Sequence, residues 1–99
     1  MTDDNLENVP ATMRTMNLTW CVHLTDKAVE HIANRVEALE NISLFGNLNL
    51  TDAILPMLGK KFKHSLHTLD INGCTSIKDR SPEKILEFLP NVTCFQVHS

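Results

Sequence analysis

The stretch that decides the fold is Leu39–Asp52, which reads LENISLFGNLNLTD. Counted from Leu39, the first, fourth, sixth and twelfth sites are apolar, the ninth is Asn47, and Thr-Asp closes the pattern. The pattern also begins 26 residues earlier at Met13 and 27 residues later at Leu66, and Val92 opens a partial fourth copy. A period of this length, within the range of about 20 to 50 residues, indicates an architecture of stacked units.

The fourth and sixth sites of each copy predict a short strand. Both are apolar in every copy, and a spacing of two residues puts their side chains on one face of a strand. The ninth site carries Cys21, Asn47 or Cys74, small side chains that can bond or pack against turn backbone otherwise buried without partners. Strands from successive copies should therefore form a parallel sheet.

A helix is expected after each strand and turn. Oxygens able to cap the first amides of these helices are carried by Thr25-Asp26, Thr51-Asp52 and Lys78-Asp79. Apolar residues then recur at helical spacing, in the ranges 28–36, 54–58 and 85–89. Pro82 suits the first turn of the third helix, and Gly59 with the lysines after it is expected to end the second.

The copies match the consensus L-x-x-L-x-L-x-x-N/C-x-L, and so they resemble leucine-rich repeats. The expected fold class is α/β: a leucine-rich-repeat solenoid forming a short horseshoe segment, with parallel strands on the concave face, helices on the convex face and repeats of about 26 residues. The expected boundaries are 1–12 for the tail of a preceding repeat or a weak N-terminal cap, 13–38, 39–65 and 66–91 for three repeats, and 92–99 for a partial terminal strand.

The N-terminal stretch is acidic and interrupted by Pro10, which makes it a poor cap for a stack of repeats. Met13 and Met16 are therefore expected to be exposed at this end. The same reasoning predicts that the chain is the C-terminal end of a longer protein, a gene-model fragment or a shortened relative.

Composition excludes several classes of function. The chain has 99 residues, 42% of them hydrophobic, and a formal net charge of −3, so it lacks the basic footprint expected of a nucleic-acid-binding protein. It contains neither an apolar run long enough to span a membrane nor a secretory signal, and its three cysteines are an odd, widely spaced set. A reduced compartment, cytoplasmic or nuclear, is expected. Four N-x-S/T triplets, at Asn17, Asn41, Asn49 and Asn91, are interpreted as products of the repeat composition rather than as glycosylation sites.

No catalytic or metal site is predicted. The five histidines lack metal-ligand spacing, and the sequence contains neither a nucleophile elbow nor a phosphate-binding loop. Gly46 and Gly73 share the eighth site of the repeat and are expected in tight turns. The protein is therefore expected to be neither an enzyme nor dependent on a cofactor.

The cysteine-containing copies resemble those of the F-box/leucine-rich-repeat family, in particular the C-terminal end of a plant-type member. The segments that carry the resemblance are Leu18–Asp26, Ser43–Gly46, Leu69–Lys78 and Leu89–Ser99. The resemblance implies a substrate-recognition module of an SCF-type (cullin) ubiquitin ligase. In that family an F-box docks on a Skp-type adaptor; no F-box precedes the repeats in this sequence, so adaptor binding is expected only if a missing N-terminal F-box exists.

The outward-facing residues of the strands are the candidate partner-binding site for another protein. They are Thr15, Asn17, Thr19, Trp20, Asn41, Ser43, Phe45, Thr68, Asp70, Asn72, Cys94, Gln96 and His98. Trp20 and Phe45 are candidate aromatic anchors. Two alternatives stay open: the polar residues simply suit an exposed sheet, or the chain is a stand-alone repeat scaffold, inhibitor or assembly protein unrelated to ubiquitination.

Overall fold

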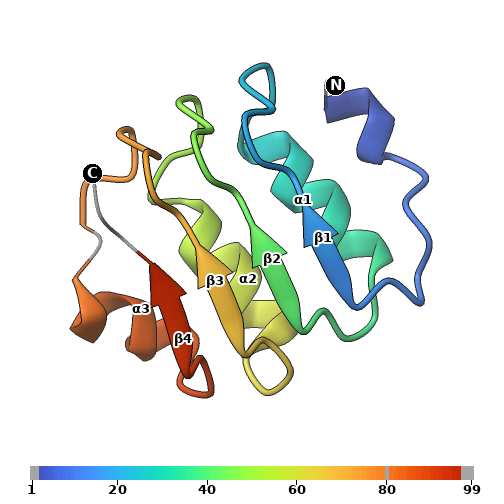
Figure 1. Cartoon of the computed structure of the whole chain (residues 1–99). Helices are drawn as coiled ribbons and strands as arrows, with labels where there is room; N and C mark the ends of the chain where they lie inside the picture. The colour runs from blue at the N-terminus through green and yellow to red at the C-terminus, as the bar shows by residue number, and fades with distance from the viewer. Residues whose placement is uncertain (1–2, 80, 97–99) are drawn as a thin grey trace.

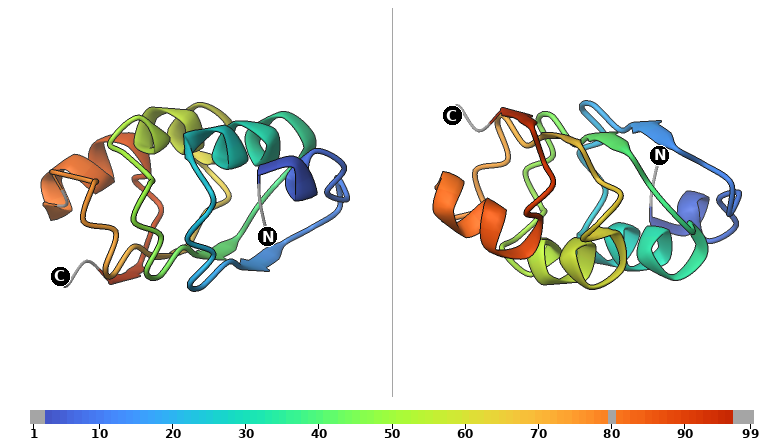
Figure 2. Two further views of the ribbon diagram at one scale, coloured as in Figure 1. Left: turned by 90° about the horizontal axis from the view of Figure 1, so that it is seen from above. Right: turned by 90° about the horizontal axis from the view of Figure 1, so that it is seen from below.

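In the computed structural model, which describes residues 3–79 and 81–96, parallel strands alternate with helices in an α/β arrangement. The strands form one sheet in the order β1-β2-β3-β4, with helices packed on one of its faces (Figures 1 and 2). The strands are β1 (Thr15–Asn17), β2 (Asn41–Ser43), β3 (Thr68–Asp70) and β4 (Cys94–Gln96). The helices are the 3-10 helix η1 (Asp3–Leu6) and the α-helices α1 (Asp26–Arg35), α2 (Ile54–Phe62) and α3 (Pro82–Phe88).

The register of the sheet reproduces the spacing of the sequence repeat. Thr15 pairs with Asn41, Asn41 with Thr68, and Thr68 with Cys94. Among the described elements, each strand runs beside only the strands of adjacent units and each helix beside only the helices of adjacent units. The prediction of a parallel sheet built from stacked strand–helix units is therefore confirmed.

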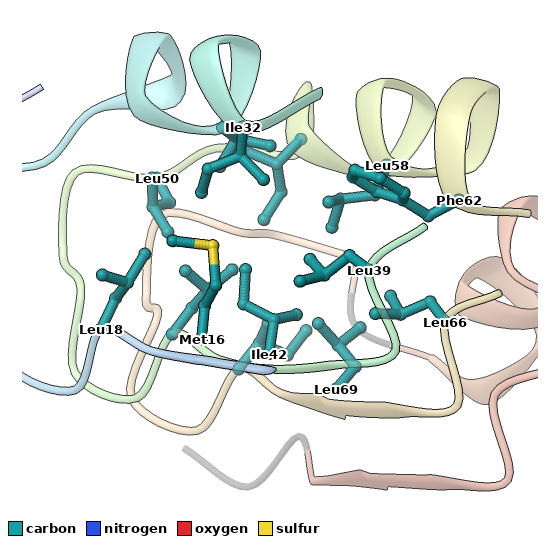
Figure 3. Packing of buried hydrophobic residues seen from close by; sticks show 14 of the residues in the cluster. Met16, Leu18, Ile32, Leu39, Ile42, Leu50, Leu58, Phe62, Leu66 and Leu69 are labelled. Carbon is teal, nitrogen blue, oxygen red and sulfur yellow. The ribbon is translucent and has the colours of Figure 1, made fainter. Parts of the chain in front are cut away.

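The core lies between the sheet and the helices (Figure 3). Met16, Ile42 and Leu69, at the centres of three strands, point inward and are buried. From the opposite side they meet helix residues such as Ile32 and Leu58, which are fully buried. Burial of apolar surface stabilises the chain by roughly 25 cal/mol per Å², and a single unit could bury little of this surface without its neighbours.

The ninth-site residues bond to turn backbone, as the sequence predicts. The Asn47 side chain is fully buried, and its Nδ2 donates to the carbonyls of Leu18 and Leu44, both at 2.8 Å. Cys74 Sγ donates to the same Leu44 carbonyl at 3.0 Å. In the first unit, Cys21 Sγ makes a longer contact of 3.8 Å with the Thr19 carbonyl. Asn47 and Cys74 thus join the turns of successive units, whereas the Cys21 contact lies within its own unit.

The N-terminal segment covers the β1 end of the core, contrary to the expectation of an exposed end. Leu6 and Val9 are buried, and η1 packs against α1. Arg35 Nε donates to the Val9 carbonyl at 3.2 Å, which holds the segment in place. Met16 is consequently only 7% exposed, and Met13 is partly buried. Sequence reasoning placed too little weight on this cover because two isolated apolar residues in an acidic stretch provide no periodic signal.

In the Thr-Asp pairs the threonines take the expected capping role, whereas the aspartates bond to the next unit. Thr25 does cap α1, since its Oγ1 accepts from the Lys27 amide at 3.2 Å, but the Asp26 carboxylate accepts from the amide and hydroxyl of Thr51 in the next unit. Asp3 accepts from Thr25 in the same way, at 2.8 and 2.7 Å. The aspartates thus form a series of bonds between units.

The second and third helices also begin differently from expectation. The carboxylate of Asp52 accepts from the amides of Lys78 and Asp79, at 2.6 and 3.0 Å, instead of capping α2. The N-cap of α2 is Ala53, whose own side chain makes no capping bond, but Thr51 Oγ1 accepts from the Ala53 amide at 3.2 Å. Ser81 caps α3 through the Lys84 amide at 3.3 Å, and Pro82 occupies the first turn as predicted.

Gly59 does not end the second helix, because α2 continues to Phe62. The glycine is instead the point of closest approach to α3. A Cβ at this position would lie 2.7 Å from the Phe88 carbonyl oxygen and 2.9 Å from the Phe88 Cβ. The absence of a side chain therefore allows α2 and α3 to pack closely.

The substitution Gly59→Ala should lower the free energy of unfolding by about 1 to 2 kcal/mol, because overpacking against Phe88 outweighs the higher helix propensity of alanine. Urea unfolding followed by circular dichroism measures this change. Lys60→Ala, on the exposed side of the same helix, is the control and should change stability by less than about 0.5 kcal/mol. A Gly59→Ala variant as stable as the parent would contradict the close packing of α2 and α3.

The bonds between units also lower the pKa of two of the aspartates. The Lys78 amide lowers the pKa of Asp52 below its ordinary value of 3.8; partial burial opposes this, and the Asp79 amide adds to the lowering. Partial burial raises the pKa of Asp3, but the amide and hydroxyl of Thr25 outweigh it, so the net shift is again downward. Each shift means that folding favours the charged carboxylate.

A carboxylate with a lowered pKa in the folded state stabilises the protein above its unfolded pKa, and this contribution is lost as the pH falls through the folded value. The free energy of unfolding should therefore decrease between about pH 5 and pH 2. Asp52→Asn should make this decrease shallower, as measured by urea unfolding across the pH range. Asp4→Asn is the matched control, since Asp4 is exposed in η1 and takes no part in these bonds. Equal slopes for Asp52→Asn and the parent would refute the role of Asp52.

Candidate protein-interaction face

The sheet face opposite the helices carries a shallow hollow of about 270 Å³. We call it the sheet hollow. Its polar lining comes from the outward-facing residues of three adjacent strands, with Met16 and Ile42 also contributing. These polar residues are Thr15, Asn17, Asn41, Ser43, Thr68 and Asp70. Six of the predicted partner-binding residues are therefore brought together by the parallel register.

Hydrogen bonds across the strands hold several of these side chains in place. Asn41 Nδ2 donates to Thr15 Oγ1 at 3.1 Å. The Thr19 hydroxyl donates to Asn17 Oδ1 at 2.6 Å and lies 3.0 Å from the Ser43 hydroxyl. A surface whose polar groups are already positioned loses less entropy when a partner binds.

The asparagines of the N-x-S/T triplets have structural partners in neighbouring units. Asn49 Nδ2 donates to the Val22 carbonyl at 2.9 Å, and Asn91 Nδ2 donates to the His64 carbonyl at 3.2 Å. With the Asn41 bond described above, three of the four triplets place an amide between two units. This packing supplies a physical reason for the frequent asparagines.

Trp20 occupies an unusual backbone conformation in the turn that follows β1. It stands at the eighth site of its repeat, where the other two units have Gly46 and Gly73 with φ of 77° and 75°. Both glycines lie in turns as predicted. Trp20 nevertheless adopts φ of 59°, a left-handed conformation that costs a non-glycine residue about 1 to 2 kcal/mol.

The Trp20 ring lies over the next unit. It meets the Phe45 ring edge-on, with centroids 5.1 Å apart and an interplanar angle of 76°. It also covers Gly46, where a Cβ would lie 2.4 Å from Trp20 Cε3. The Trp20 amide donates to the Phe45 carbonyl at 2.7 Å, so the strand ladder continues into this turn. Trp20 is still 63% exposed.

Two apolar residues near this aromatic pair were missed by sequence reasoning. Val22 and Leu48 are 38% and 47% exposed, and both stand at the tenth site of the repeat. The sequence signal that could have revealed them is an apolar residue at the tenth site of two repeats, because that site lies outside the core pattern. Exposed apolar clusters often mark interaction surfaces.

The fourth strand extends the candidate face only in part. The backbones of Cys94 and Gln96 align with Thr68 and Asp70, but their side chains lie outside the described part of the structure. His98 lies outside the described residues altogether. The prediction for these three side chains therefore stays a prediction.

The helix face carries a second groove, of about 360 Å³, between α1 and α2. Its lining mixes a carboxylate, two lysines and apolar groups: Glu30, Ala33, Asn34, Met57, Lys60 and Lys61. Among the described residues, no three His, Cys, Asp or Glu side chains are grouped so that they could hold a metal ion. The described helices include none that is both long and apolar enough to cross a membrane.

No protein-family model matches this sequence.

Trp20→Gly and Trp20→Ala separate the cost of the left-handed backbone from the loss of ring contacts. Both remove the ring, but only alanine keeps a Cβ at positive φ, so the glycine variant should be more stable by about 1 kcal/mol. Urea unfolding followed by circular dichroism measures the difference. The same two substitutions at Val22, which has negative φ, are the control and should not favour glycine. Equal stabilities of the two Trp20 variants would contradict backbone strain at this residue.

Proposed function

We propose that this chain is a leucine-rich-repeat module that binds another protein across its exposed sheet face, which would be the concave face of a longer horseshoe. The observation that carries the proposal is the sheet hollow, which three strands line with positioned polar side chains. The Trp20–Phe45 pair lies in the turns that follow two of these strands. The 26- and 27-residue register of the strands and the turn bonds of Asn47 support the leucine-rich-repeat assignment.

Within this class, the proposed role is substrate recognition for an SCF-type (cullin) ubiquitin ligase in the cytoplasm or nucleus. Its support is the resemblance of the cysteine-containing repeats to those of F-box/leucine-rich-repeat proteins. The role requires an F-box, supplied by further sequence or by a partner chain, to bind the Skp-type adaptor. The sheet hollow would then hold the protein to be ubiquitinated.

A stand-alone scaffold, inhibitor or assembly protein is the second candidate. The observation that favours it is the packing of η1, Leu6 and Val9 over the β1 end of the core, because a free-standing stack needs a covered end. Both candidates use the same binding face. They differ in whether the adaptor and cullin accompany the bound protein.

Affinity purification with the chain and two matched variants tests the proposal. Asn41→Arg places a long cation in the sheet hollow, whereas Asn34→Arg makes the same change on α1, in the groove of the helix face. Proteins that bind the hollow should be lost with Asn41→Arg and retained with Asn34→Arg, as measured by quantitative mass spectrometry. Circular dichroism establishes that both variants are folded.

The opposite pattern, retention with Asn41→Arg and loss with Asn34→Arg, would overturn the proposed face. Co-purification of a Skp-type adaptor and a cullin with expressed protein that carries any upstream F-box supports the ligase role. Partners that depend on the hollow without adaptor or cullin support the stand-alone role.

A further inference from the structure

Asp70 and Phe45 are neighbours on the exposed face of two adjacent strands. The amides of Leu44 and Gly46 donate to the carbonyls of Asp70 and Asn72, both at 2.8 Å, so Phe45 lies beside these two residues. Asp70 Oδ1 accepts from the Asn72 amide at 3.0 Å, which turns the carboxylate toward this end of the strand. Because Asp70 pairs with Ser43, two residues before Phe45, the carboxylate and the Phe45 side chain are diagonal neighbours on the exposed face, where the strands end.

The Asp70 carboxylate has the capacity to bind a further group. Among the described residues that line the hollow, it is the one ionisable side chain, and it is partly exposed. A carboxylate accepts about four hydrogen bonds, of which the Asn72 amide uses one. Arg14, which directly precedes β1, directs its guanidinium to the carbonyls of Thr12 and Met13.

The aromatic pair complements this charge. Aromatic rings attract cations over their faces, and a guanidinium group can also stack on them. Trp20 and Phe45 are held rigidly by their mutual contact, and Trp20 remains largely exposed despite its unfavourable backbone. Backbone strain retained at an exposed aromatic residue is typical of functional positions.

We infer that Asp70, Phe45 and Trp20 form a subsite for a basic side chain, above all arginine, from an extended segment of the partner protein. The carboxylate would accept hydrogen bonds from the guanidinium while the rings contact its planar face. Small polar side chains on either side of the arginine would suit the threonines and asparagines of the sheet hollow. This inference rests on the proposed function and specifies the chemistry of the partner.

The test uses a fluorescein-labelled capped peptide of five residues, with arginine at the centre and serine and glycine on either side. A second peptide carries citrulline, which keeps the shape of arginine and lacks its charge. Anisotropy measures the affinity of each peptide for the chain. The emission of Trp20, the sole tryptophan of a chain without tyrosine, reports with an unlabelled peptide whether binding occurs at the subsite.

The arginine peptide should bind with a dissociation constant about tenfold lower than the citrulline peptide, as expected for a charge-assisted hydrogen bond. It should also change Trp20 emission in a saturable way and bind more weakly at higher salt concentration. Asp70→Asn should remove about the same factor, whereas Asp4→Asn, an equal charge change on η1, should not. Equal affinities for the two peptides, or unchanged arginine affinity in Asp70→Asn, would overturn the subsite.

Failure of this inference and failure of the proposed function give different results. If neither peptide binds but Asn41→Arg still removes captured proteins, the sheet hollow is a binding face and the cationic subsite is wrong. If the arginine peptide binds through Asp70 but captured proteins are indifferent to Asn41→Arg, the subsite is supported and the proposed binding face for whole proteins is wrong.

Discussion

The structure depends on hydrogen bonds that join each unit to the next in a fixed register. The backbone ladder pairs residues 26 or 27 positions apart and continues from the strands into the turns, where Trp20 and Gly46 still donate to the neighbouring unit. Asn47 and the Asp3, Asp26 and Asp52 carboxylates add side-chain bonds across the same boundaries. Once these bonds fix the register, every inward side chain meets its counterpart in the core.

The same register builds the candidate site. A period of two within each strand sends one set of side chains to the core and the other to the exposed face, and the parallel pairing then aligns the exposed sets of adjacent strands. Asn41, Ser43, Thr68 and Asp70 line one hollow for this reason. The aromatic pair is positioned by the turn bonds rather than by the strands, so it lies beyond the strand residues that line the hollow.

Much of this arrangement could be predicted from the sequence because the spacing of apolar residues in the repeat is enough to assign the strands and their inward faces. The inward residues, the strand order and the role of Asn47 follow from the repeat. The cover provided by Leu6 and Val9 does not, because how well two isolated apolar residues in an acidic stretch pack against the next unit cannot be read from their spacing. The left-handed conformation of Trp20 was also not predicted, because a tryptophan by itself does not indicate positive φ. The signal was the alignment of Trp20 with Gly46 and Gly73 at the eighth site of the repeat.

The roles of Gly59 and of the aspartates were not predicted, for a related reason. A glycine or an aspartate has a familiar local meaning at a helix end, and the structure uses Gly59, Asp26 and Asp52 for contacts with the next unit instead. Local sequence alone does not contain the partner in such contacts.

The restriction of contacts to adjacent units has a consequence for how such a protein changes over evolutionary time. A duplicated unit inserted between two existing ones would meet a strand, a turn and a helix of the kind it already contacts, and the Asp26–Thr51 type of bond would simply occur once more. Duplication or deletion of a unit can therefore change the number of repeats while the packing within each remaining unit stays the same. The exposed side chains of each new unit would then be free to diverge.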